Sequence, residues 1–124
     1  MAHETILIVE DNDSARASVA KILENAGYRT DSAANGREAL NYLQSRPSPD
    51  LILLDMLLPV LDGWHFLEEV QKTKKSTAPI IVTTGTVLSR EWALDHGCAG
   101  FVRKPIDVDE LLPEIRSCIS GTRP

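Results

Sequence analysis

The sequence alternates between two kinds of apolar segment, and this alternation restricts the possible folds more than any other feature. Short runs rich in β-branched and aliphatic residues are typical of strands, whereas apolar residues recurring every three or four positions are typical of helices. Five strands are predicted in this way, at residues 5–9, 28–33, 51–54, 80–84 and 100–103. Because helical segments separate the strands over short connections, the pattern predicts an α/β protein with a parallel sheet between two helical layers.

Five helices are predicted between and after these strands. Their apolar residues lie within 15–26, 39–43, 66–70, 88–92 and 108–119. Gly27 and Gly97 follow the first and fourth of these segments, where a residue in the left-handed conformation commonly ends a helix. Either Asp13 or Ser14 is expected to cap the start of the first helix.

The apolar content of each strand predicts its place in the sheet. The strands at 5–9, 51–54 and 80–84 are nearly continuous apolar runs, as expected for strands covered by helices on both faces. The strand at 28–33 alternates with polar residues and the strand at 100–103 is short, so both are expected at the edges. The prediction is a doubly wound, five-stranded parallel sheet with order 2-1-3-4-5, flanked by five helices. Such sheets bind ligands beyond the carboxyl ends of the strands, where the strand order reverses.

Length, charge and composition limit the classes of protein to consider. We expect a single domain over 1–124, with a core at about 5–120 and a tail at 121–124. A formal net charge of −5 is unfavourable for holding a phosphate backbone, so direct nucleic-acid binding is not expected. No purely apolar run exceeds four residues, whereas about 20 are needed to cross a bilayer, so no membrane contact is expected. With no secretory leader expected, Cys98 and Cys118 are predicted to be reduced thiols in the cytoplasm.

Charged or hydroxyl-bearing residues stand at the carboxyl ends of four of the predicted strands. Carboxylates that converge there repel one another, by about 4 kcal/mol for two unit charges about 4 Å apart at an effective dielectric constant of about 20. Oxygen ligands without a nearby His or Cys favour Mg2+ as the neutralising cation. An aspartate beside Mg2+, a lysine and a hydroxyl is the set of groups needed to accept a phosphoryl group. The residues concerned are Glu10, Asp11, Asp55, Thr83, Thr84 and Lys104.

Four segments containing these residues form an ordered set of motifs. They are Ile-Leu-Ile-Val-Glu10-Asp11, Asp55-Met-Leu-Leu-Pro59-Val-Leu-Asp62-Gly63, Pro79-Ile-Ile-Val-Thr-Thr84-Gly85 and Gly100-Phe101-Val-Arg-Lys104-Pro105. Each motif alone is weak, but together they resemble the response-regulator receiver domains of bacterial two-component signalling, which are CheY-like. The resemblance extends from Thr5 to about Ser120. It implies the flavodoxin-like receiver fold and a regulatory phosphoacceptor domain that catalyses only its own phosphorylation and dephosphorylation.

The resemblance implies specific roles for the acidic residues. Asp55 is expected to be phosphorylated by a sensor histidine kinase or a phosphotransfer protein. The cofactor is expected to be Mg2+, bound directly by Asp11 and Asp55, through water by Glu10, and by the backbone carbonyl of Leu57.

The resemblance also implies a switch. Thr84, which lies five residues after Pro79, is expected to move to the phosphoryl group, and Lys104 to pair with it. Phe101 matches the aromatic residue whose ring turns inward on activation. The Lys104–Pro105 peptide bond is expected to be cis, as is common in the family.

The family signals through the face formed by the fourth helix, fifth strand and fifth helix, where an unidentified downstream protein is expected to bind. Thr84 and Lys104 lie closer in sequence than in typical members, which predicts a short fourth helix or entry loop. Pro113 is expected to kink or delay the last helix. We expect a monomer or a phosphorylation-dependent homodimer. Trp64 is expected in the core, whereas core packing and a partner contact remain equally open for Trp92.

Two other functions are possible for a chain with this fold. A protein-interaction module with this fold that does not use phosphorylation is the main alternative. Its expected signature, the loss of Asp55, Asp11 or Lys104, is absent. A hydrolase that forms an aspartyl phosphate with outside substrates usually needs a second aspartate two positions after the nucleophile, where this chain has Leu57.

Overall fold

The computed structural model describes residues 4–56, 63–73, 78–85 and 89–120, and Leu57, Leu88 and the predicted tail at 121–124 lie outside this described part. Five strands and five helices alternate along the chain, as predicted. The strands are β1 Thr5–Val9, β2 Arg29–Ala33, β3 Leu51–Asp55, β4 Ile80–Thr84 and β5 Gly100–Arg103. The helices are α1 Asp13–Asn25, α2 Gly36–Ser45, α3 Gly63–Thr73, α4 Arg90–Asp95 and α5 Val108–Ser120.

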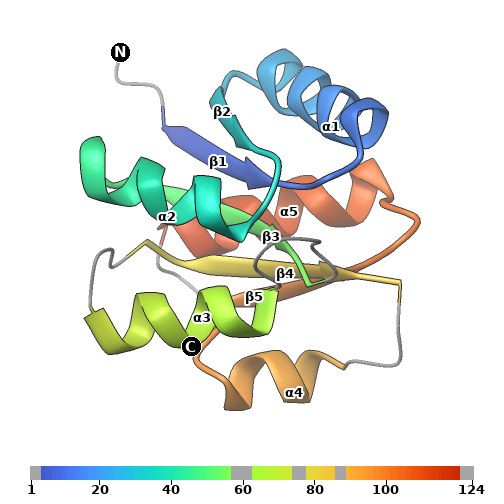
Figure 1. Ribbon diagram of the computed structural model, residues 1–124. Helices are drawn as coiled ribbons and strands as arrows, with labels where there is room; N and C mark the ends of the chain where they lie inside the picture. Colours follow the sequence, from blue (N-terminus) through green and yellow to red (C-terminus); the bar gives the residue numbers. More distant parts are fainter. Residues whose placement is uncertain (1–3, 57–62, 74–77, 86–88, 121–124) are drawn as a thin grey trace.

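The strands form one parallel sheet with the order β2-β1-β3-β4-β5, which confirms the predicted fold class (Figure 1). The order reverses between β1 and β3, because β2 lies on one side of β1 whereas β3, β4 and β5 follow on the other. In the register, Val9 pairs with both Ala33 and Leu54, and Asp55 pairs with Thr83. The carboxyl ends of the central strands therefore lie at one edge of the sheet, and the residues that follow them meet there.

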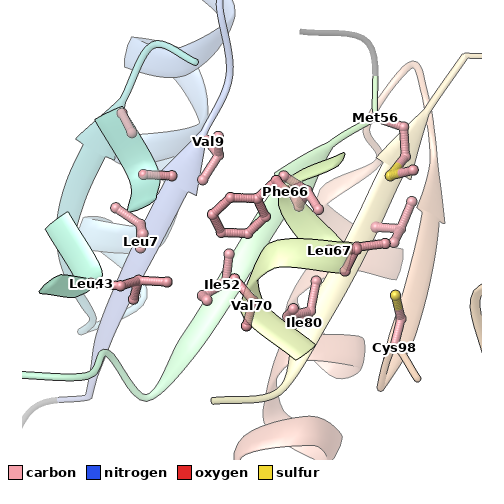
Figure 2. Packing of buried hydrophobic residues seen from close by; sticks show 14 of the residues in the cluster. Leu7, Val9, Leu43, Ile52, Met56, Phe66, Leu67, Val70, Ile80 and Cys98 are labelled. Atoms are coloured by element: carbon pink, nitrogen blue, oxygen red, sulfur yellow. The ribbon is translucent and has the colours of Figure 1, made fainter. Parts of the chain in front are cut away.

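Helices cover both faces of the sheet because the side chains of a strand alternate between its two faces. Leu7, Ile52 and Val82 pack against α2, α3 and α4 on one face. Figure 2 shows this layer, with Phe66 of α3 lying between β1 and β3 residues. Their sequence neighbours, such as Ile8, point to the opposite face and pack against α1 and α5.

Local signals at the helix ends were mostly predicted correctly. Gly27 and Gly97 have φ angles of 98° and 81°, in the left-handed region expected of helix-ending glycines. The predicted cap of α1 was wrong: Asn12 is the capping residue, and its side chain accepts a 2.8 Å hydrogen bond from the Ala15 N–H. Asp13 already belongs to the first turn of the helix. Asn and Asp cap about equally well, so composition could not distinguish them.

The expected core position of Trp64 was also wrong, since this residue is 43% exposed. Phe66, Leu67 and Val70 supply the larger buried side chains of α3. Trp64 instead lies toward α4, with its ring centroid 5.6 Å from that of Trp92 and 5.0 Å from that of His96. Trp92 is half-buried against the core, so the two tryptophans lie in one aromatic cluster between α3 and α4.

The α4–β5–α5 face contains both departures noted in the sequence. Helix α4 has only six residues, which confirms the predicted shortening. Helix α5 begins at Val108 and continues through Pro113, so the proline does not delay it. Within the described residues, no helix has the length and apolar character required to cross a membrane.

Replacing Phe66 with alanine tests the core that supports the sheet. Phe66 is fully buried, and the substitution is expected to lower the free energy of unfolding by about 3–5 kcal/mol through lost burial and the cavity left behind. Glu68→Ala is the control on the exposed side of α3, with an expected change within about 0.5 kcal/mol. Urea unfolding measures both, and equal effects would contradict the described packing.

Candidate functional site

Three carboxylates converge at the carboxyl edge of the sheet. Glu10 and Asp11 follow β1, and Asp55 ends β3. Each residue offers a carboxylate oxygen, and the three oxygens all lie within 4.8 Å of one another. Glu10 and Asp55 are buried, whereas Asp11 is exposed, so the cluster meets solvent on the Asp11 side.

Lys104 supplies the positive charge of this cluster. Its Nζ lies 2.7 Å from Glu10 Oε1 and 3.3 Å from Asp55 Oδ2. The backbone places the side chain, because Lys104 directly follows β5 and its N–H donates a 2.9 Å hydrogen bond to the Thr84 carbonyl. The Lys104–Pro105 peptide bond is cis. The ammonium group of Lys104, which follows β5, thus contacts one residue that follows β1 and one that ends β3.

The pKa values in the cluster reflect competition between burial and charge pairing. Burial alone would raise the pKa of Glu10, but hydrogen bonds from the Lys104 ammonium and the Asn12 N–H outweigh it, and the pKa is lowered. Burial alone would lower the pKa of Lys104, but the hydrogen bond to Glu10 and the charge of Asp55 outweigh it, and the pKa is raised. Both shifts favour the ion pair, so Glu10 and Lys104 are charged around neutral pH.

The other predicted switch residues lie in the neighbouring strands β4 and β5. Thr84 is fully buried at the end of β4. Its neighbour Thr83 is paired in register with Asp55 and directs its hydroxyl to the Leu54 carbonyl, 3.4 Å away. Phe101 is 8% exposed and its side chain belongs to the core cluster, so the ring is turned inward in this structure. The Leu57 carbonyl, the remaining predicted metal ligand, lies outside the described residues.

Sequence reasoning missed two residues that support Glu10. The Asn12 N–H donates a 3.1 Å hydrogen bond to Glu10 Oε2. The Arg16 guanidinium donates a 2.9 Å bond to the Glu10 carbonyl and pairs with Asp13 at 2.6 Å. The three-residue spacing of Asp13 and Arg16 on a predicted helix indicated that pair. The contact with the Glu10 backbone depends on how the loop enters α1, which no spacing reveals.

The residues present fit a hard divalent cation. Carboxylate oxygens close together, one of them exposed, are the ligand type that Mg2+ prefers. Among the described residues, Asp11, Asp55 and Glu10 would hold such an ion. Lys104 neutralises part of the negative charge of the cluster but cannot itself ligate a cation.

The fold and the cluster define a doubly wound α/β protein with an acidic, lysine-bearing site at the reversal point of its sheet. The family model described as the response regulator receiver domain matches residues 6–116. The chain therefore belongs to the receiver domain family of two-component response regulators, which is regulatory in function.

Curated relatives share this region of sequence. The transcriptional regulatory protein HprR of Escherichia coli is 34% identical over 112 residues, which cover 90% of this chain and 50% of that protein. The response regulator MprA of Mycolicibacterium vanbaalenii is 35% identical over 121 residues, which cover 96% of this chain and 52% of MprA. The chain thus spans about half the length of these relatives.

Two solved structures share the fold over nearly their whole length. The chemotaxis protein CheY4 of Vibrio cholerae has a TM-score of 0.84 and 30% identity, with 94% of this chain and 99% of that chain covered. A response regulator described as putative, from Chloroflexus aurantiacus, has a TM-score of 0.86 and 29% identity, covering 96% and 99%.

A metal bound by the three carboxylates stabilises the folded state by mass action. Millimolar Mg2+ is therefore expected to raise the melting temperature of the wild-type protein, and Asp11→Ala to remove most of that increase. Asp11 is exposed, so the variant is expected to fold. Asp95→Ala changes an exposed aspartate at the end of α4; this acidic control should respond to Mg2+ as the wild type does. A full response in Asp11→Ala would place the metal elsewhere.

The lowered pKa of Glu10 predicts how stability depends on pH in the metal-free protein. Since the folded pKa lies below the ordinary value of 4.5, the unfolded chain binds the proton first as the pH falls. The stability that the Glu10 carboxylate contributes is present above pH 4.5 and is lost as the pH falls through the folded pKa. Urea unfolding with a chelator present, repeated from neutral pH to below pH 4.5, measures this loss in the free energy of unfolding. Glu10→Gln should show a shallower decline, and an equally steep one would contradict the pairing.

Proposed function

We propose that this receiver domain is a phosphorylation-controlled switch in which Asp55 is the phosphoacceptor and Mg2+ is the cofactor. The observation that carries the proposal is the contact of the Lys104 ammonium with both Asp55 and Glu10, beside the exposed carboxylate of Asp11. A carboxylate nucleophile, a fixed cation and an acidic metal site are together the groups that phosphoryl transfer to aspartate requires.

In the proposed reaction, a carboxylate oxygen of Asp55 attacks the phosphorus of a phosphohistidine. The P–N bond breaks, the imidazole leaves with the bonding electron pair and takes up a proton, and an aspartyl phosphate forms. Lys104 would pair with a phosphoryl oxygen, and the Thr84 hydroxyl would donate a hydrogen bond to another. Bound Mg2+, held by Asp11, Asp55 and the Leu57 carbonyl and by Glu10 through water, would neutralise charge on the transferring group.

The surface beside the site supports a protein as the phosphoryl donor. A groove of about 270 Å3 opens next to Glu10 and Lys104, and α1 forms one wall with Ala15, Val19 and Ile22. The other wall is formed by Pro105 and Ile106 after β5. An apolar wall beside a charged cluster suits a protein domain that presents a histidine, so we assign a sensor histidine kinase or phosphotransfer protein as the donor.

The output follows from a change between two conformations. A phosphoryl group on Asp55 would favour the state in which Thr84 has moved toward it and Phe101, whose ring is already turned inward in this structure, has shifted with Thr84. The α4–β5–α5 face would then change its affinity for a downstream protein. We propose that residues 1–124 act as one cytoplasmic receiver domain, as a monomer or a phosphorylation-dependent homodimer. No direct contact of this domain with nucleic acid or membrane is part of the proposal.

Intact-protein mass after incubation with a small acyl phosphate tests the proposed chemistry. The wild type is expected to gain one phosphoryl group with Mg2+ and far less without it, because the metal neutralises the transferring oxygens. Asp55→Asn lacks the nucleophile and should gain none, whereas the matched control Asp50→Asn, which changes an exposed aspartate just before β3, should be labelled like the wild type.

Two outcomes would argue against the proposal. Equal labelling of Asp55→Asn and the wild type would place the phosphoryl group on another residue. No labelling of a folded wild-type protein that binds Mg2+ would favour the phosphorylation-independent interaction module.

A further inference from the structure

Within the part of the chain that the structure describes, strand β5 is an open edge of the sheet and pairs with β4 alone. In such a strand, the backbone groups of alternate residues point away from the neighbouring strand and need other partners. The Lys104 N–H donates to Thr84 of β4. Phe101, three residues earlier, directs its N–H and C=O toward the open edge, where side chains contact them.

Two helices supply those partners. Glu114 Oε2 of α5 accepts a 3.1 Å hydrogen bond from the Phe101 N–H, and the Arg90 guanidinium of α4 donates a 3.3 Å bond to the Phe101 carbonyl. Arg90 and Glu114 also bond each other at 2.7 Å. We call Arg90, Phe101 and Glu114 the edge clasp. It closes a ring of contacts that joins α4, β5 and α5.

Burial distinguishes the edge clasp from an ordinary surface ion pair. The Glu114 side chain is only 10% exposed, whereas that of Arg90 is 47% exposed. Removing one partner of a buried charge costs far more than removing one from an exposed pair. Gly100 provides the space, because a Cβ there would overlap Glu114 Oε2 and lie 3.2 Å from Cys118 Sγ.

The edge clasp also forms part of the α4–β5–α5 surface. A hollow of about 520 Å3 is lined by all three of its residues and by residues of α5 that include Asp109 and Pro113. A change in the clasp would therefore alter this surface as well as the edge of the sheet.

We propose that Arg90 and Glu114 are positioning residues that hold the main chain of Phe101 and tie the first turn of α4 to it. The coupling to signalling rests on the proposed function, in which Phe101 shifts when Asp55 is phosphorylated. With the main chain held at both its N–H and its C=O, the shift of Phe101 is confined to its side chain. Arg90 keeps the first turn of α4 beside β5, so that this helix, whose Trp92 and Ala93 share the core cluster of Phe101, responds to the ring. The same bonds oppose the pairing of β5 with a strand of another molecule, since the outward N–H and C=O of Phe101 already have hydrogen-bond partners.

Hydrogen exchange of the Phe101 amide, measured by NMR without Mg2+ or phosphoryl donor, tests the clasp by itself. Glu114→Leu is expected to speed exchange at Phe101 about ten-fold or more, the factor a lost bond to a charged group produces. Glu114→Gln keeps an acceptor and should retain most of the protection, and Glu110→Leu, an exposed site on the same helix, should change nothing. Unchanged protection in Glu114→Leu would overturn the proposal.

Exchanging the two charges separates the clasp from a plain ion pair. Arg90→Glu combined with Glu114→Arg restores opposite charges but places a donor beside the Phe101 N–H and an acceptor beside its C=O. Protection of Phe101 is therefore expected to stay lost. Wild-type protection in the exchanged protein would overturn the proposal, and if Glu114→Leu does not fold, this comparison and Arg90→Met decide the question.

Tryptophan fluorescence measures the coupling to α4, because Trp92 lies in α4 and Trp64 packs beside it. Addition of Mg2+ and an acyl phosphate should change the wild-type signal, while Arg90→Met should gain the phosphoryl group by mass yet lose most of that change. Equal changes in both proteins would overturn the coupling. If the wild type gains no phosphoryl group, the proposed function and the coupling are both wrong. The edge clasp itself is then tested only by hydrogen exchange at the Phe101 amide.

Discussion

The site depends on the contacts of the Lys104 ammonium with Glu10 and Asp55. A parallel sheet brings the carboxyl ends of its strands together, and in this chain the described residues at those ends include three carboxylates. Two of them, Glu10 and Asp55, are buried, which would be unfavourable without a nearby positive charge. Lys104 contacts both, although it lies 94 positions from Glu10 in sequence. The cluster can therefore form only after β1, β3 and β5 have assembled into one sheet.

Lys104 directly follows β5, which is an edge strand of the sheet. β5 has four residues and a neighbour on one side only. Its position is fixed by β4, by the core contacts of Phe101 and Val102, and by the bonds that Arg90 and Glu114 make to the Phe101 backbone. One short strand thus precedes the lysine that contacts Asp55 and also carries the Phe101 backbone that Arg90 and Glu114 hold, so the site and the α4–β5–α5 face share one structural element.

The sequence predicted the structure correctly where the burial of a segment determines its residue pattern. The alternating polarity of residues 28–33 placed β2 at an edge, and the apolar runs placed β1, β3 and β4 in the centre, because burial on both faces selects such runs. The sequence did not predict the position of a side chain that depends on a partner far away in the chain. The exposed position of Trp64 depends on its contact with Trp92 on another helix, and the Arg90–Glu114 pair spans 24 positions with no periodic signal. The roles of Asp55 and Thr84 remain predictions, although the structure places Asp55 beside Lys104 as the motifs implied.

The weak attachment of α4 explains how a small chemical change at one edge of the sheet could alter a surface. This helix has six residues and buries only Ala93 completely. Among its contacts are the aromatic cluster with Trp64 at one end and the edge clasp at the other. Elements held by few buried contacts have the lowest free energy of local rearrangement, whereas the central strands are packed on both faces and resist displacement. A phosphoryl group on Asp55 would therefore move α4 before it moved the sheet, because the same interaction energy produces the larger displacement where less packing has to be disrupted.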